Sequence, residues 1–295
     1  MLGGRTFHRL EPRLQAKHRR HALPPLSLPL FRRSYGDPAS PATPILLIHG
    51  LFGSAVNWHP IVGRLHALLG ADRHLIVPDL RNHGQSPHDP ILSYEAMAED
   101  LIGLLDQVGI ARAALVGHSL GGKVAMWLAL NWPERVAALA VVDIAPVTYP
   151  ARFRRLIVAL QELDLRTLAS RRDADARLVA AIPEAMMRGF LLQNLRKTEA
   201  GWGWRINLTA LPGAMPGLGG FPDAQGRRFP GPTAFIHGGD SDYVTAAQLP
   251  LIRSLFPRAE LVVIPGAGHW VHADQPEACA RALADVLADR HSAEP

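Results

Sequence analysis

Short apolar runs alternate with amphipathic segments along most of the chain. We expect strands at the apolar runs, which lie at 26–34, 44–49, 74–80, 113–117, 136–143, 233–237 and 261–264. We expect helices where apolar residues recur every three or four positions, at 57–69, 94–108, 123–131 and 275–288. Apolar strands that alternate with helices are typical of a mostly parallel sheet flanked by helices on both faces. The pattern therefore predicts the α/β class.

The alternation stops between residues 145 and 230. This segment has helical patterns at 152–163, 173–182 and 184–195, then a stretch with Trp and Gly at 201–211 and no expected strand. The Pro and Gly residues of 211–232 indicate the exit from this segment and not a disordered linker. Open parallel sheets bind ligands at the carboxyl ends of their strands, and an insert here would cover that edge. We predict a core of 26–144 and 231–290 with an inserted helical cap of 145–230.

Composition and charge narrow the class of protein. The chain has 295 residues, 19% charged residues and a formal net charge of +5. Many basic residues gather near the start, at Arg5, Arg9, Arg13, Lys17, Arg19 and Arg20. No basic stripe follows an element that could contact nucleic acid, so we expect no nucleic-acid partner. We interpret 1–25 as a basic leader that is disordered.

Cysteine usage and hydropathy bear on the compartment. The single cysteine, Cys279, excludes an intramolecular disulfide and fits a reducing compartment. The sequence has no run of 18 apolar residues, and it therefore predicts no membrane span. We expect a cytoplasmic protein, monomeric or a small homo-oligomer, that acts on a small molecule.

The sequence GHSLGG at 117–122 is the strongest chemical signal. It follows an apolar strand and opens a helix, and these three parts together make a nucleophile elbow. Such a turn strains its serine and lifts the hydroxyl above the sheet edge, which makes Ser119 the candidate nucleophile. The backbone N–H of Leu120 is a candidate oxyanion donor. The N–H of Leu51, in the glycine-rich turn after the strand at 44–49, is the second.

A serine hydroxyl needs an oriented base, and chains with this elbow order the residues as Ser, acid, His. His269 follows the last expected strand and a run of small residues, so we prefer it as base over His272. Two carboxylates compete as the acid. Asp143 ends the strand at 136–143, and Asp242 lies in the turn after the next core strand. Spacing alone favours Asp242.

Six sequence runs together resemble one family. They are IHGLFGS at 48–54, DLRNHGQSPH at 79–88, GHSLGGK at 117–123, VDIAP at 142–146, FLLQNL at 190–195 and GHWVHA at 268–273. Between residues 26 and 287 the chain is similar to small bacterial carboxylesterases of the α/β-hydrolase superfamily, which are related to abhydrolase domain-containing protein 11. The resemblance implies a hydrolase core with a helical cap. It also implies hydrolysis of short- to medium-chain carboxylic esters, with acyl thioesters as a further class, and no cofactor.

The resemblance also bears on the acid. Bacterial members of the family place a carboxylate at the position of Asp143, and several lack one in the turn after the next strand. This chain has carboxylates at both places and so departs from that pattern. We choose Asp143 and keep Asp242 in reserve.

The resemblance assigns the acyl pocket to the cap, with Phe190 and Trp202 as candidate lining residues. Asn82 and His83, in the loop after the strand at 74–80, would shape the wall of the pocket. No cluster of His, Asp and Glu has the spacing of metal ligands, so we expect no metal.

Other functions use the same residues. A cofactor-free haloperoxidase or a carbon–carbon bond hydrolase would keep this triad, since function depends on the pocket. Dehalogenases and epoxide hydrolases of this fold typically use Asp as nucleophile, which Ser119 disfavours. A non-catalytic binding protein on a hydrolase scaffold would commonly lose a triad member or an elbow glycine, and this chain has lost neither.

Overall fold

A seven-stranded sheet forms the centre of the computed structural model, which describes residues 27–150 and 152–288. Its strands, in spatial order, are β1 (Arg32–Tyr35), β3 (Leu75–Pro78), β2 (Ile45–Ile48), β4 (Ala113–His118), β5 (Val136–Val142), β8 (Thr233–Gly238) and β9 (Ala259–Ile264). β1 is antiparallel to β3, and all other neighbours are parallel. The prediction of an α/β fold with a mostly parallel sheet is confirmed. The predicted leader at 1–25 lies outside the described residues.

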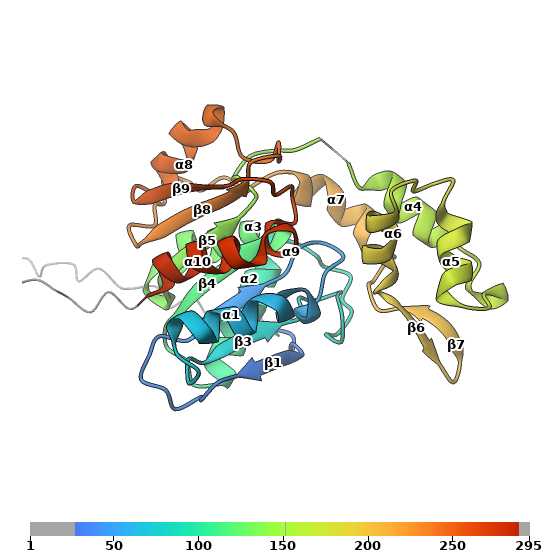
Figure 1. Ribbon diagram of the computed structural model, residues 1–295, viewed down its shortest axis with the longest axis horizontal. Coiled ribbons are helices and arrows are strands. Elements are labelled where there is room, and N and C mark those ends of the chain that lie inside the picture. Colours follow the sequence, from blue (N-terminus) through green and yellow to red (C-terminus); the bar gives the residue numbers. More distant parts are fainter. Residues whose placement is uncertain (1–26, 151, 289–295) are drawn as a thin grey trace, which may run out of the picture.

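Helices cover both faces of the sheet (Figure 1). α1 (His59–Leu69) and α10 (Pro276–Leu287) pack on one face, and α2 (Tyr94–Gln107) and α3 (Leu120–Asn131) pack on the other. The side chains of β2 alternate between the two layers, with Ile45 and Leu47 facing one and Leu46 and Ile48 facing the other. All four are fully buried, which explains why the strand is an unbroken apolar run.

Several short elements lie outside the predicted pattern. The strand expected at 26–34 is only β1 at Arg32–Tyr35, an antiparallel edge strand. Two helices of the core were not predicted, α8 (Leu249–Leu255) and α9 (Val271–Asp274). Four 3₁₀ helices are also present, η1 (Ala55–Trp58), η2 (Pro133–Arg135), η3 (Leu165–Thr167) and η4 (Ala246–Gln248). These elements span three to seven residues, too few for a helical period to show in the sequence.

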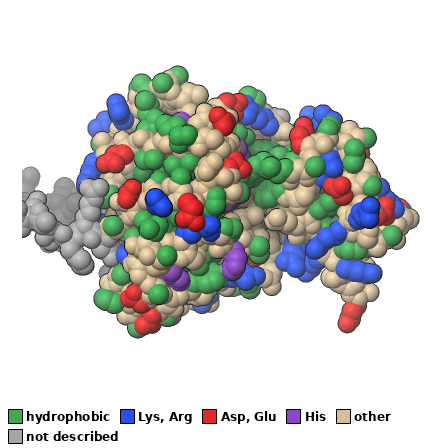
Figure 2. All heavy atoms as spheres, in the orientation of Figure 1, with side chains coloured by type: hydrophobic (Ala, Val, Ile, Leu, Met, Phe, Trp, Pro, Cys, Tyr) green, Lys and Arg blue, Asp and Glu red, His purple; other side chains and the backbone are tan. Residues whose placement is uncertain are grey.

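The segment 145–230 connects β5 to β8 and lies beyond one end of the sheet (Figure 1). Its helices are α4 (Arg154–Glu162), α5 (Arg171–Leu178), α6 (Ala185–Leu192) and α7 (Leu211–Gly219). An antiparallel hairpin of β6 (Leu195–Thr198) and β7 (Gly201–Trp204) follows α6. Figure 2 shows hydrophobic side chains gathered where this segment meets the core.

One prediction for this segment is wrong. We expected no strand, but β6 and β7 pair there, joined by a tight turn in which Gly201 has a φ of +108°. Three of the four residues of β6 are exposed, so no apolar run marks the strand. The exit expected at 211–232 begins with the helix α7. Its first Pro falls in the first turn, which a helix tolerates because the N–H there has no partner in any case.

Candidate active site

Ser119 lies in the sharp turn between β4 and α3. Its backbone has φ +51° and ψ −117°, a strained conformation for a residue with a side chain. The glycines around it are required by space. A Cβ on Gly117 would lie 2.2 Å from the carbonyl oxygen of Gly121, and a Cβ on Gly121 would lie 2.4 Å from that of Ile48. The local sequence therefore folds into the elbow that the motif predicted.

His269 and Asp143 extend from Ser119 in a line of hydrogen bonds. The Ser119 hydroxyl lies 3.1 Å from Nε2 of His269, and Nδ1 of His269 lies 2.7 Å from Oδ2 of Asp143. With the proton on Nδ1 donated to the carboxylate, Nε2 is free to accept the proton of the serine. The structure thus brings together three of the residues singled out in the sequence.

The Asp143 carboxylate is completely buried but fully hydrogen-bonded. Besides His269, it accepts the hydroxyl of Ser241 at 2.5 Å on Oδ2 and the backbone N–H of Gly238 at 3.0 Å on Oδ1. These donors come from the end of β8 and the turn that follows it. They stabilise a charge that burial alone would make costly.

Asp242, the alternative acid, points elsewhere. Its side chain is 67% exposed and forms an ion pair with Arg152, 2.7 Å between Nη2 and Oδ2. The hydrogen bond from Arg152 holds the pKa of Asp242 below its usual value. Among the two carboxylates that compete in the sequence, only Asp143 is hydrogen-bonded to the imidazole of His269.

Two further residues, which the sequence analysis missed, hold the imidazole in place. The ring of Tyr243 stacks on His269, with centroids 4.0 Å apart and an angle of 20° between the planes. His118 donates from Nε2 to the backbone carbonyl of His269 at 2.9 Å. Burial, together with the neighbouring His272 and His269, lowers the pKa of His118 well below its usual value, so its ring is neutral. The signal available for His118 was its place inside the G-x-S-x-G motif.

The turn after β2 borders Ser119 on the side of the candidate oxyanion donors. A Cβ on Gly50 would lie 3.2 Å from Cβ of Ser119, so Leu51, the next residue, begins beside Ser119. His49 holds this turn by accepting the N–H of Leu80 at 3.0 Å and donating to the Gly50 carbonyl at 2.8 Å. Burial lowers the pKa of His49 to about 4, which keeps the ring neutral.

A cavity of about 240 Å³ opens at Ser119 and His269 between the core and the segment 145–230. Phe190 lines it, as expected, and so do Met187 and Trp270. Its exposed lining is mostly apolar, a common property of ligand pockets.

Three of the predicted lining residues do not line this cavity. Asn82 and His83 are completely buried in the turn after β3. The amide oxygen of Asn82 there accepts the N–H of Asp89 at 2.8 Å. Trp202 instead packs within the segment 145–230, where its indole N–H donates to the carbonyl of Leu168 at 2.8 Å.

Grouped metal ligands and membrane-spanning helices are both absent from the described part of the chain. Within residues 27–150 and 152–288, no three His, Cys, Asp or Glu residues are grouped as metal ligands would be. No helix of the same residues has the length and apolar character needed to cross a bilayer.

Comparison with known proteins places the chain. A family model described as the alpha/beta hydrolase fold matches residues 43–276. The chain belongs to the α/β-hydrolase family. Over 259 residues it is 41% identical to the mouse protein named sn-1-specific diacylglycerol lipase ABHD11, which covers 86% of this chain and 83% of that protein.

Two esterases are similar to this α/β hydrolase over most of their length. The Escherichia coli esterase YbfF is 39% identical over 248 residues, which are 84% of this chain and 94% of that protein. The solved structure of a marine microorganism esterase superimposes with a TM-score of 0.82 at 35% identity, covering 88% of this chain and 99% of that one. The predictions of an α/β hydrolase related to carboxylesterases, and of an ester hydrolase, are confirmed.

Proposed function

We propose that this α/β hydrolase cleaves short- to medium-chain carboxylic esters through an acyl-enzyme on Ser119. The observation that carries the proposal is the continuous line of hydrogen bonds from Ser119 through His269 to the buried Asp143. The names of the esterase and lipase relatives support ester hydrolysis. Acyl thioesters, which react by the same steps, are a second substrate class.

Each residue has a role in this mechanism. His269 removes the proton from the Ser119 hydroxyl while Oγ bonds to the carbonyl carbon of the ester. The N–H groups of Leu51 and Leu120 stabilise the oxyanion, and Asp143 keeps His269 in the correct tautomer. His269 then gives its proton to the leaving alcohol oxygen as the bond from carbon to that oxygen breaks. Water, activated by the same His269, releases the acid.

The segment 145–230 serves as the cap in this proposal. Its residues Phe153, Met187 and Phe190 lie in the cavity wall opposite the catalytic residues and would exclude water from the bound ester. A cytoplasmic location and a monomeric or small homo-oligomeric state stay predictions from the sequence.

Ser119→Ala tests the proposal directly. We expect the parent protein to hydrolyse p-nitrophenyl esters from acetate to octanoate, and Ser119→Ala to lose on the order of 10⁶ in kcat. Ser254→Ala, which changes an exposed serine on α8, is the matched control and should keep parental activity. Activity of Ser119→Ala within tenfold of the parent would refute the mechanism. A parent inactive on esters and thioesters would refute the substrate class and turn attention to haloperoxidase or carbon–carbon bond cleavage.

A further inference from the structure

A second cavity, of about 140 Å³, adjoins Ser119 on the side of α3. It shares four lining residues with the larger cavity, which are Leu51, Ser119, Phe153 and Tyr243. The two cavities therefore meet at the nucleophile and extend from it in different directions. An ester bound at Ser119 has two arms, the acyl chain and the alcohol, and each arm needs its own space.

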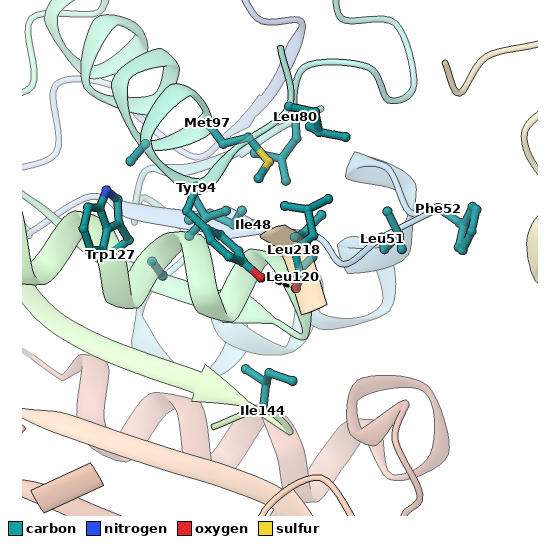
Figure 3. Packing of buried hydrophobic residues seen from close by; sticks show 14 of the residues in the cluster. Ile48, Leu51, Phe52, Leu80, Tyr94, Met97, Leu120, Trp127, Ile144 and Leu218 are labelled. Atoms are coloured by element: carbon teal, nitrogen blue, oxygen red, sulfur yellow. Dashed lines mark hydrogen bonds between the residues drawn. The ribbon is translucent and has the colours of Figure 1, made fainter. Parts of the chain in front are cut away.

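The residues that line only one of the two cavities show which of them the imidazole borders. Four residues belong to the smaller cavity alone, namely Leu120, Tyr94, Ile144 and Leu218. In Figure 3 the side chains of Tyr94, Leu120 and Leu218 lie together, and that of Ile144, which follows β5, lies farther from them. His269 belongs to the larger cavity alone. The imidazole thus borders one space and not the other.

The position of His269 decides which arm lies where. The proton that His269 takes from Ser119 has to return to the leaving oxygen, so that oxygen must face the imidazole. The acyl chain does not have to face the imidazole, and it is attached to the carbonyl carbon on the side away from the leaving oxygen. The space beyond His269 is therefore open to the alcohol, and the space beside Leu120 is left for the acyl chain.

We propose that the larger cavity holds the alcohol of the ester and the smaller cavity holds its acyl chain. The assignment rests on the proposed serine esterase function and adds a substrate class to it. The class is an ester of a compact, apolar acyl group with a bulkier alcohol. When Ser119 Oγ bonds to the carbonyl carbon, the alcohol takes its proton from His269 and leaves through the larger cavity. The acyl group stays in the smaller one until water replaces the alcohol beside His269.

Two cations in the wall of the smaller cavity are already paired. The ammonium of Lys123 donates to the carbonyl oxygens of Val147, Gly219 and Gly220 at 2.9, 3.2 and 2.6 Å. Arg152 is held by Asp242. Because these partners occupy the three hydrogens of the ammonium, Lys123 has none left for a carboxylate. The smaller cavity therefore suits an acyl chain that ends in a methyl group.

The back wall of the smaller cavity is fastened to the core. The hydroxyl of Tyr94 on α2 donates to the carbonyl of Leu218 at 2.5 Å, and Lys123 on α3 binds the two residues that follow. These bonds tie the C-terminal end of α7 to the helices of the core. A wall held in this way limits the length of the acyl chain that fits in the smaller cavity.

The same substitution on each side tests the assignment. Met215 on α7 lines only the smaller cavity and Met187 on α6 lines only the larger one, and both are half-buried in the segment 145–230. Met215→Trp and Met187→Trp therefore add the same volume at matched positions. One substrate series varies the acyl chain, as p-nitrophenyl acetate and hexanoate. The other varies the alcohol, as phenyl and 1-naphthyl acetate.

For each series we compare the ratio of kcat/KM values in the variant with the same ratio in the parent, because the intrinsic reactivity of the substrates cancels in that comparison. We expect Met215→Trp to lower the hexanoate-to-acetate ratio about tenfold and to change the naphthyl-to-phenyl ratio less than about twofold. Met187→Trp should do the reverse. The assignment would be overturned if Met215→Trp changed the alcohol series and Met187→Trp the acyl series. It would also be overturned if each variant changed both series equally, or if neither variant changed either series. Thermal unfolding confirms that both variants are folded. Absence of turnover dependent on Ser119 in the parent would instead mean that the proposed function itself is wrong.

Discussion

Replacing Asp143 by asparagine probes the structural basis of the candidate site. The carboxylate accepts three hydrogen bonds, from His269, Ser241 and Gly238. An asparagine of the same shape offers one oxygen and one NH₂ group. If the NH₂ faces His269, Nδ1 must become an acceptor and Nε2 then carries the proton, so it cannot accept that of Ser119. If the NH₂ faces Gly238 instead, two donors meet in a buried space.

The magnitude follows from these two outcomes. The wrong tautomer lowers kcat by about 10⁴ in a comparable triad, which corresponds to about 5.5 kcal/mol of barrier. The buried donor left without a partner in the second arrangement lowers the free energy of unfolding by about 1–3 kcal/mol. Because the second arrangement carries this cost, the first is preferred, and we therefore expect Asp143→Asn to be folded and nearly inactive.

Asp242→Asn is the matched control. It removes an exposed ion pair with Arg152, which is worth at most about 1 kcal/mol, and leaves the line from Ser119 to Asp143 intact. The assay is kcat/KM on p-nitrophenyl butyrate for both variants, with urea unfolding of each. Activity of Asp143→Asn within tenfold of the parent, with a large loss in Asp242→Asn, would show that Asp143 is not the acid.

Two further predictions concern stability. Lys123→Met leaves the carbonyls of Val147, Gly219 and Gly220 without their buried donor and should lower the free energy of unfolding by about 2–4 kcal/mol; an unchanged urea midpoint would contradict this. Burial lowers the pKa of His49 and His272 to about 4 and that of His83 to about 3. Between pH 6.5 and about 4 the unfolded chain then binds more protons than the folded one. As the pH decreases through this range, the free energy of unfolding should fall by up to about 1.4 kcal/mol per pH unit for each histidine. Urea unfolding from pH 7.5 to 4.5 measures this slope, and a flat profile would disprove it.

The sheet and the elbow could be predicted because their signals are local. β2, β4 and β5 are buried on both faces, so each is an apolar run that stands out from its surroundings. The elbow is equally local, since the collisions that require Gly117 and Gly121 occur around a single turn. A pattern within about ten residues was sufficient for these features.

The pocket could not be predicted because it depends on distant packing. Phe190 and Trp202 are both aromatic residues of the segment 145–230, and nothing local separates them. Phe190 packs on Trp270, with centroids 5.6 Å apart, and so borders the cavity at His269. Trp202 lies on a hairpin whose tight turn directs it to Leu168 instead. Trp202 lies away from the cavity because it belongs to this hairpin, which no apolar run in the sequence indicates.

The choice of acid shows how a competing signal can belong to the same site. The turn at 238–243 contains Asp242, the alternative candidate for the acid. In the structure its other residues organise Asp143, because Gly238 and Ser241 donate to the carboxylate and Tyr243 stacks on His269. Asp242 points outward and binds Arg152 of the segment 145–230. The turn therefore connects the segment 145–230 to the imidazole of His269, which gives its polar residues a structural role even with Asp143 as the candidate acid.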